Sequence, residues 1–137
     1  EGWTLDPEPK QMRVATFRVR VGESEAELIV SSLPGEQSGS PEANVNRWRS
    51  QIGLGPVKDM GTVVSEPVTV GDVKGTMMDF GGAGEPAASG KQVLVVQALK
   101  SGSVWYFKLI GPAPLVTAQK KALAAFVESI EFAPTGE

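Results

Sequence analysis

The sequence contains no cysteine and no histidine. Without cysteine the chain has no disulfide, no thiolate nucleophile and no thiolate-ligated metal site. Without histidine it lacks the usual general base near neutral pH and the commonest metal ligand, so Ser-His-Asp and Cys-His arrangements are excluded. These absences argue against an enzyme and predict no metal and no cofactor, although carboxylates, lysine and tyrosine remain available for chemistry.

Long apolar runs and clustered positive charge are missing as well. No run is long enough to span a bilayer. The 13 Lys and Arg residues are scattered along a chain of net charge −3, which argues against a nucleic-acid partner. No signal peptide is visible at Glu1, and the numbering starts without methionine. We therefore expect membrane attachment only through a lost N-terminal leader or lipid anchor.

The pattern that is present centres on two neighbouring strands, predicted at Gln92–Leu99 and Ser103–Ile110. Both carry apolar residues on both faces, which is typical of a central pair in a covered sheet. Alternation and turn residues predict four further strands, at Met12–Val21, Glu25–Ser31, Thr62–Val70 and Val73–Phe80. The first hairpin is expected nearer an edge, because its faces differ more in polarity.

Two amphipathic helices are predicted. Ser40-Pro41-Glu42 supplies an N-cap hydroxyl, a proline at the first helical position and an acid in the first turn, and Gly53 is placed to end this helix. Val45, Trp48 and Ile52 form its apolar stripe. The second helix is predicted as one continuous element over Pro114–Glu128.

Residues 1–137 fit a single domain. Residues 1–11 are interpreted as an extended lead-in, and 81–90 as a mobile loop in which no residue can anchor to a core. The predicted fold is α+β: a largely antiparallel sheet of about six strands covered by helices on both faces, an α/β/α sandwich.

The residues also resemble known proteins. The resemblance is carried by the segments Met12–Phe17, Asn44–Leu54, Trp105–Pro112 and Phe126–Phe132. The chain resembles a family of uncharacterised bacterial secreted or lipoprotein domains, which implies an extracytoplasmic, periplasmic or envelope-anchored protein. Its element order is similar to the fold shared by the PsbP subunit of photosystem II and the Ran-binding release factors. That second likeness implies architecture alone, because fold and function are separable.

One cluster stands out as a candidate site on the first helix. Asn44, Arg47 and Gln51 are three and four residues apart, so they share a flank beside Trp48. Such a flank can bind a carboxylate, a sugar or a partner's backbone. The alternative is that Trp48 belongs to the core and the polar groups satisfy one another internally. Lys108 interrupts an apolar strand, and either pairs with an acid at the sheet rim or lines a pocket.

Three acids, Glu23, Glu25 and Glu27, share one face of a predicted edge strand. A calcium site needs six or more oxygens from a curved loop, so protection of the sheet edge is the preferred interpretation.

The sequence leaves two specific functions open, besides a purely structural domain that carries no site of its own. The first is a non-enzymatic binding or assembly module of the bacterial cell envelope, which contacts a protein or small ligand through the helix flank and the loop at 81–90. The second is a small-ligand binder or carboxylate-dependent hydrolase, with a pocket between sheet and helix that uses Asp79 with Lys108 or Arg47.

Overall fold

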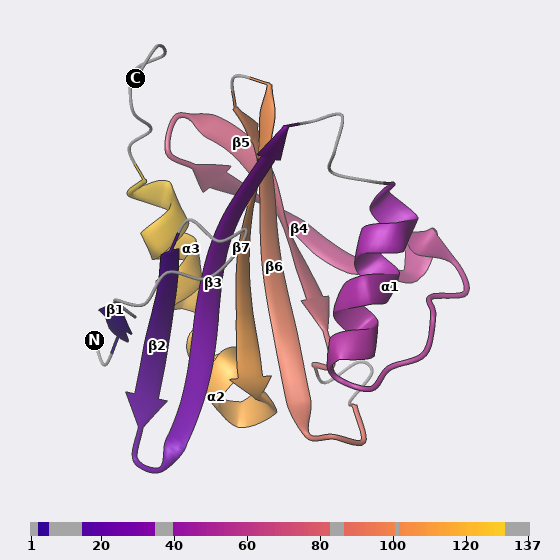
Figure 1. Cartoon of the computed structure of the whole chain (residues 1–137), viewed down its shortest axis with the longest axis vertical. Coiled ribbons are helices and arrows are strands. Elements are labelled where there is room, and N and C mark those ends of the chain that lie inside the picture. Colours follow the sequence, from indigo (N-terminus) through magenta and orange to yellow (C-terminus); the bar gives the residue numbers. More distant parts are fainter. Residues whose placement is uncertain (1–2, 6–14, 35–39, 83–86, 101, 131–137) are drawn as a thin grey trace.

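The structure is a computed structural model that describes residues 3–5, 15–34, 40–82, 87–100 and 102–130. Seven strands form one sheet in the order β1-β2-β3-β7-β6-β5-β4 (Figure 1). They are β1 Trp3–Leu5, β2 Ala15–Val21, β3 Ser24–Pro34, β4 Val64–Val70, β5 Val73–Phe80, β6 Lys91–Lys100 and β7 Ser103–Pro112. Every neighbouring pair is antiparallel, as predicted. The sequence analysis missed β1, which lies inside the segment predicted to be a lead-in.

The helices are α1 Pro41–Gln51, α2 Ala113–Ala118 and α3 Lys120–Glu128, and a short 3-10 turn spans Met60–Thr62. Within the described part of the chain, no helix has the length and apolar character needed to cross a membrane.

The β6–β7 hairpin lies in the middle of the sheet and is buried on both faces, which confirms the central prediction. Four consecutive residues of β6, Val93 to Val96, are fully inaccessible to solvent. On β7, Phe107 and Leu109 are buried toward one face, while Val104 and Tyr106 are buried toward the other. Alternate residues of both strands therefore belong to two different hydrophobic clusters.

Each cluster includes residues from different helices. Val45, Trp48 and Ile52 of α1 pack with Val93, Val95 and Tyr106 on one face. Val116 of α2 and Leu123 and Val127 of α3 belong to the other cluster, together with Leu94, Val96 and Phe107. We call the faces of the strands that carry these two clusters the α1 face and the α2/α3 face. Figure 1 shows α2 and α3 behind the strands.

The prediction of a single closing helix over Pro114–Glu128 is wrong, because two helices, α2 and α3, meet at Gln119. The Gln119 backbone N–H donates to both Leu115 and Val116 carbonyls at 3.1 Å, and its ψ is 4°. The two helices pack on different strands, α2 on β6 and β7 and α3 on β4. Tertiary packing therefore divides a stretch whose local pattern favours one helix.

The loop between β5 and β6 also differs from the prediction. Ala87 is 8% exposed and belongs to the cluster on the α1 face, and the Ser89 hydroxyl donates to the Ile52 carbonyl at 2.7 Å. The premise that nothing in 81–90 anchors to the core is therefore wrong, since Ala87 does so. Residues 83–86 lie outside the described part of the chain.

The first hairpin departs from the prediction in two ways. β3 continues beyond the predicted end at Ser31 to Pro34, because Ser32 and Leu33 pair with Trp105 and Val104 of β7. β3 is also not an edge strand, since it lies between β2 and β7.

Edge protection by the three acids is consequently wrong. Glu25 and Glu27 lie opposite Arg20 and Arg18 of β2 and pair with them at 3.1 and 3.6 Å. Among the residues that the structure describes, no group of three acids is placed to hold a metal ion.

Candidate functional site

Both ends of α1 are fixed by capping interactions, as the sequence predicted. The Ser40 hydroxyl accepts a hydrogen bond from the Ala43 backbone N–H at 3.1 Å. At the other end Gly53 has φ of +85°, and its N–H donates to the Ser50 carbonyl at 3.1 Å. The next N–H, from Leu54, donates to the Arg49 carbonyl at 2.9 Å, which completes a Schellman motif. These caps set the position of α1 over the sheet.

The inner stripe of α1 is core. Val45, Trp48 and Ile52 are 1%, 3% and 1% exposed. The Trp48 ring packs against Tyr106 and Phe80, with centroids 5.8 and 6.2 Å apart. Trp48 therefore stabilises the fold, and its indole face is closed to a ligand.

One flank of α1 is occupied by the connector that follows the helix. The Asn46 side-chain oxygen accepts from the Val57 backbone N–H at 2.8 Å, and the Arg49 Nε donates to the Gly55 carbonyl at 2.6 Å. Arg49 is 8% exposed. This side of the helix is satisfied within the chain.

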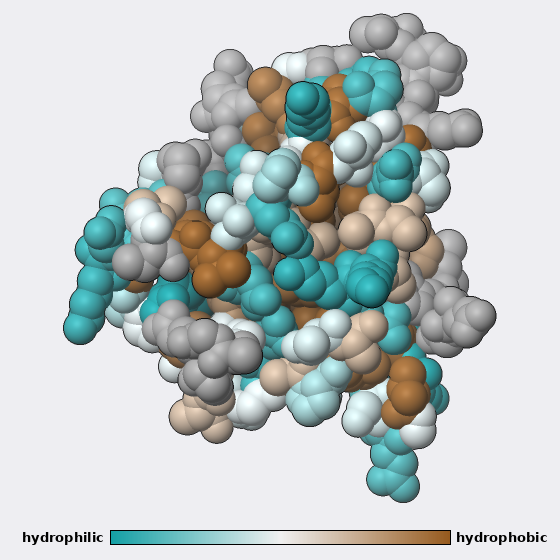
Figure 2. All heavy atoms as spheres, turned by 180° about the vertical axis from the view of Figure 1, so that it is seen from behind, coloured by the Kyte–Doolittle hydropathy of each residue, from teal (hydrophilic) through white to brown (hydrophobic). Residues whose placement is uncertain are grey.

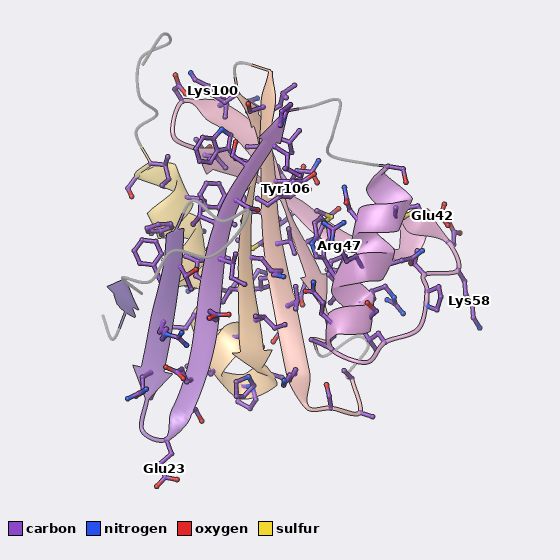
Figure 3. The ribbon with its side chains drawn as sticks, viewed as in Figure 1. Glu23, Glu42, Arg47, Lys58, Lys100 and Tyr106 are labelled. Carbon is purple, nitrogen blue, oxygen red and sulfur yellow. The ribbon has the colours of Figure 1, made fainter. Side chains whose placement is uncertain are left out.

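The opposite flank carries three of the predicted site residues. The Arg47 Nη1 donates to Asn44 Oδ1 at 2.8 Å, and Asn44 Nδ2 donates to the Tyr106 hydroxyl at 3.4 Å. The Arg47 guanidinium carbon also lies 5.7 Å from the centroid of the Trp48 ring. Asn44 is buried, whereas Arg47 is exposed. Figure 3 shows Arg47 on the side of α1 nearer the strands, with Glu42 and Lys58 on the outer side.

Lys108 joins this flank from β7. Its Nζ donates to the amide oxygen Gln51 Oε1 at 2.8 Å, so Lys108 contacts α1, and the predicted pairing with an acid stays a prediction. Lys108 lies opposite Val95 of β6 and Ile29 of β3, on the same face as Tyr106. We call Asn44, Arg47, Gln51, Tyr106 and Lys108 the polar flank.

The structure therefore brings together all five residues that the sequence singled out. Four are polar or charged side chains around the edge of α1, and Trp48 lies beneath them. The sequence analysis missed Tyr106 as a member. Its alternation with Lys108 on one strand was the available signal, because residues two apart on a strand point to the same face.

Asp79 does not belong to this site. It lies opposite Leu94, on the α2/α3 face, where its Oδ1 accepts from Gln92 Nε2 at 2.8 Å. The Gln92 Oε1 in turn accepts from the Thr117 hydroxyl at 2.7 Å. Because the sheet separates Asp79 from Arg47 and Lys108, the predicted pocket that combined them is wrong.

Asp79 instead borders a hollow of about 40 Å³ on the other side of the molecule. The hollow is lined by Val64, Ser65, Glu66, Met77, Asp79 and Lys120. An ion pair of 3.1 Å joins Glu66 to Lys120. Figure 2 shows this side of the molecule, where hydrophilic and hydrophobic residues are mixed. A space this small is on the scale of a single water molecule.

Comparison with known proteins gives little further information. No protein-family model matches the chain, and no curated protein matches it. Among solved structures, the chain is similar to the solution structure of cyanobacterial PsbP (CyanoP) from Synechocystis sp. PCC 6803. The identity is 14%, the TM-score is 0.48, and the match covers 93% of this chain and 79% of the other. The match is with a protein of the PsbP class that the sequence resembles, and at this TM-score it carries no inference about function.

Proposed function

We propose that this protein is a non-enzymatic binding or assembly module of the bacterial cell envelope, and that the polar flank is its contact surface. The module is an α/β/α sandwich of the PsbP type in this proposal, with α1 as the cover that carries the site. The packing of α1 and of α2 and α3 in separate clusters supports this arrangement.

One observation carries the proposal. Arg47 is exposed, yet its guanidinium is held by Asn44 and lies against the Trp48 ring. Within the described residues it makes no ion pair. A long cationic side chain that is already held in one geometry loses little further rotamer entropy when a partner binds it. The missing histidine and cysteine favour binding over catalysis.

The alternative, a hydrolase that uses Asp79 with Arg47 or Lys108, is not supported, because those groups lie on opposite faces of the sheet. A small-ligand binder that uses the polar flank alone is a variant of the present proposal.

Photo-cross-linking tests the contact surface. Ser50 is exposed and lies three residues beyond Arg47, so a photoreactive residue there samples molecules bound to the polar flank. Lys58, beyond the occupied flank, is the matched control position. We expect an adduct in producing cells from position 50 and not from 58, and we expect Arg47→Ala with Gln51→Ala to abolish it. No adduct, or equal adducts from both positions, contradicts the proposal.

The envelope location is tested separately. The native protein should be found in the envelope or periplasmic fraction of the producing bacterium. Recovery from the cytosolic fraction overturns the location and leaves the contact surface to its own test.

A further inference from the structure

We infer that the polar flank binds a carboxylate of an acidic peptide segment in a partner protein, with Arg47 as the main contact and Lys108 beside it. This inference rests on the proposed function and specifies the chemistry of the partner.

The first argument is the direction of the hydrogen bonds. Asn44 Oδ1 accepts from Arg47, and Gln51 Oε1 accepts from Lys108. Both amide oxygens of the flank therefore already have donors. Each oxygen keeps one further lone pair, so the flank offers a partner mainly N–H donors, those of the Arg47 guanidinium and the Gln51 amide. A surface that offers donors selects a ligand that accepts hydrogen bonds.

The second argument is charge. Two of the five residues in the polar flank, Arg47 and Lys108, are cationic, and none is acidic. A guanidinium meets a carboxylate through parallel N–H donors, and such charge-assisted hydrogen bonds are about twice as strong as neutral ones. The cation–π contact with Trp48 and the bond to Asn44 hold the planar group in place, which reduces the entropy lost on binding.

The structure also separates the ligand chemistries that the sequence left open. A sugar site needs an exposed aromatic face, and Trp48 is 3% exposed. A partner's backbone is neutral and offers N–H groups as well as carbonyls, so it matches neither the positive charge of the flank nor its excess of donors. The carboxylate is the ligand that matches both the donors and the charge.

The extent of the positive charge limits the partner to a short segment. The whole chain has a net charge of −3, so its long-range field repels polyanions such as DNA. Two cations on one flank act over about a Debye length, roughly 8 Å at physiological salt. A few acidic side chains in an extended peptide fit that range.

Fluorescence anisotropy with a fluorescein-labelled hexaglutamate peptide tests the inference, with hexaglutamine as the uncharged control. We expect hexaglutamate to bind, to weaken as salt rises, and to lose roughly tenfold or more in affinity with Arg47→Gln. Lys58→Gln removes an exposed cation away from the flank and should change affinity by less than about twofold. Equal binding of hexaglutamine, or equal effects of the two substitutions, overturns the inference.

A second variant protects the test against a folding defect. Lys108→Gln removes the other cation of the flank and should also weaken hexaglutamate binding, with urea unfolding measured on each variant. Unchanged binding in folded Lys108→Gln contradicts the assignment of Lys108.

The cross-linking experiment separates the two levels of the proposal. If position 50 forms its adduct and hexaglutamate does not compete with it, the carboxylate assignment is wrong while the contact surface stands. If no adduct forms at all, the proposed function fails whatever the peptide does.

Discussion

The two faces of the sheet use similar apolar packing but place their polar groups differently. On the α2/α3 face, two hydrogen bonds join Thr117, Gln92 and Asp79, and only the central residue, Gln92, is buried, at 2% exposed. On the α1 face, the corresponding chain runs from Tyr106 through Asn44 to Arg47, which is exposed. The chain through Gln92 satisfies a buried amide and so stabilises the fold, whereas the chain through Asn44 ends on an exposed cation that is available to a partner.

The largest expected effect comes from removing an aromatic residue from either face. Phe107→Ala on the α2/α3 face and Trp48→Ala on the α1 face should each lower the free energy of unfolding by about 3–5 kcal/mol, because both side chains are almost fully buried. Urea unfolding measures both. If either variant lost less than about 1 kcal/mol, the replaced aromatic residue would not be buried in its hydrophobic cluster as described.

The next effect comes from the polar chain around the buried Gln92 side chain. Gln92→Leu leaves the Asp79 carboxylate and the Thr117 hydroxyl without their partner, and should destabilise the protein by about 1–3 kcal/mol. Thr117→Val, which keeps the side-chain shape and removes one hydroxyl, should destabilise it less. Equal unfolding midpoints for Gln92→Leu and the parent would mean that the chain contributes nothing to stability.

The sequence predicted those elements whose signals are local. Ser40 and Gly53 mark the ends of α1 through short-range capping chemistry, and the alternation of apolar residues identified the central hairpin. The three residues of β1 carry no such signal, because their pairing with β2 is decided across a longer stretch of chain. The division of the closing helix at Gln119 likewise depends on which strands its two halves contact.

Part of the candidate site was likewise predictable from local spacing, and the rest depends on the order and register of the strands. Helical spacing predicted that Asn44, Arg47 and Gln51 share a flank. Lys108 meets Gln51 because α1 lies over the face of β7 that carries Lys108, and this depends on the sheet order. Placing Asp79 with Lys108 was wrong because each residue's face follows from strand register, which composition does not reveal.

A smaller effect is expected at the end of α1. Gly53→Ala introduces a Cβ at φ of +85° and should destabilise the protein by about 1–2 kcal/mol, although no atom lies near the added group. Gly55→Ala is the control, since its surroundings are also open and its φ is ordinary. Thermal unfolding of the two variants isolates the backbone strain, because neither added methyl group meets a neighbouring atom. A similar Tm for both would remove the conformational argument for the helix cap.

A pH-dependent effect is expected at the hairpin tips. A hydrogen bond from Lys100, with Nζ 2.9 Å from Asp72 Oδ2, lowers the pKa of Asp72 below its ordinary 3.8. A lowered folded pKa means that the stabilisation is present above pH 3.8 and is lost as pH falls through the folded value. The pair is solvent-exposed, so the effect is small. Asp72→Asn should lower Tm slightly at pH 6, and the difference should shrink as pH falls below 3.8; a constant difference would contradict the pairing.

The central claim is that Arg47 serves a partner and not the fold, and urea unfolding of Arg47→Gln tests it most directly. We predict a loss in the free energy of unfolding of at most about 1 kcal/mol, because Arg47 is exposed but donates one hydrogen bond to the buried Asn44. A loss of more than about 2 kcal/mol would assign Arg47 to the internal polar network and contradict the account.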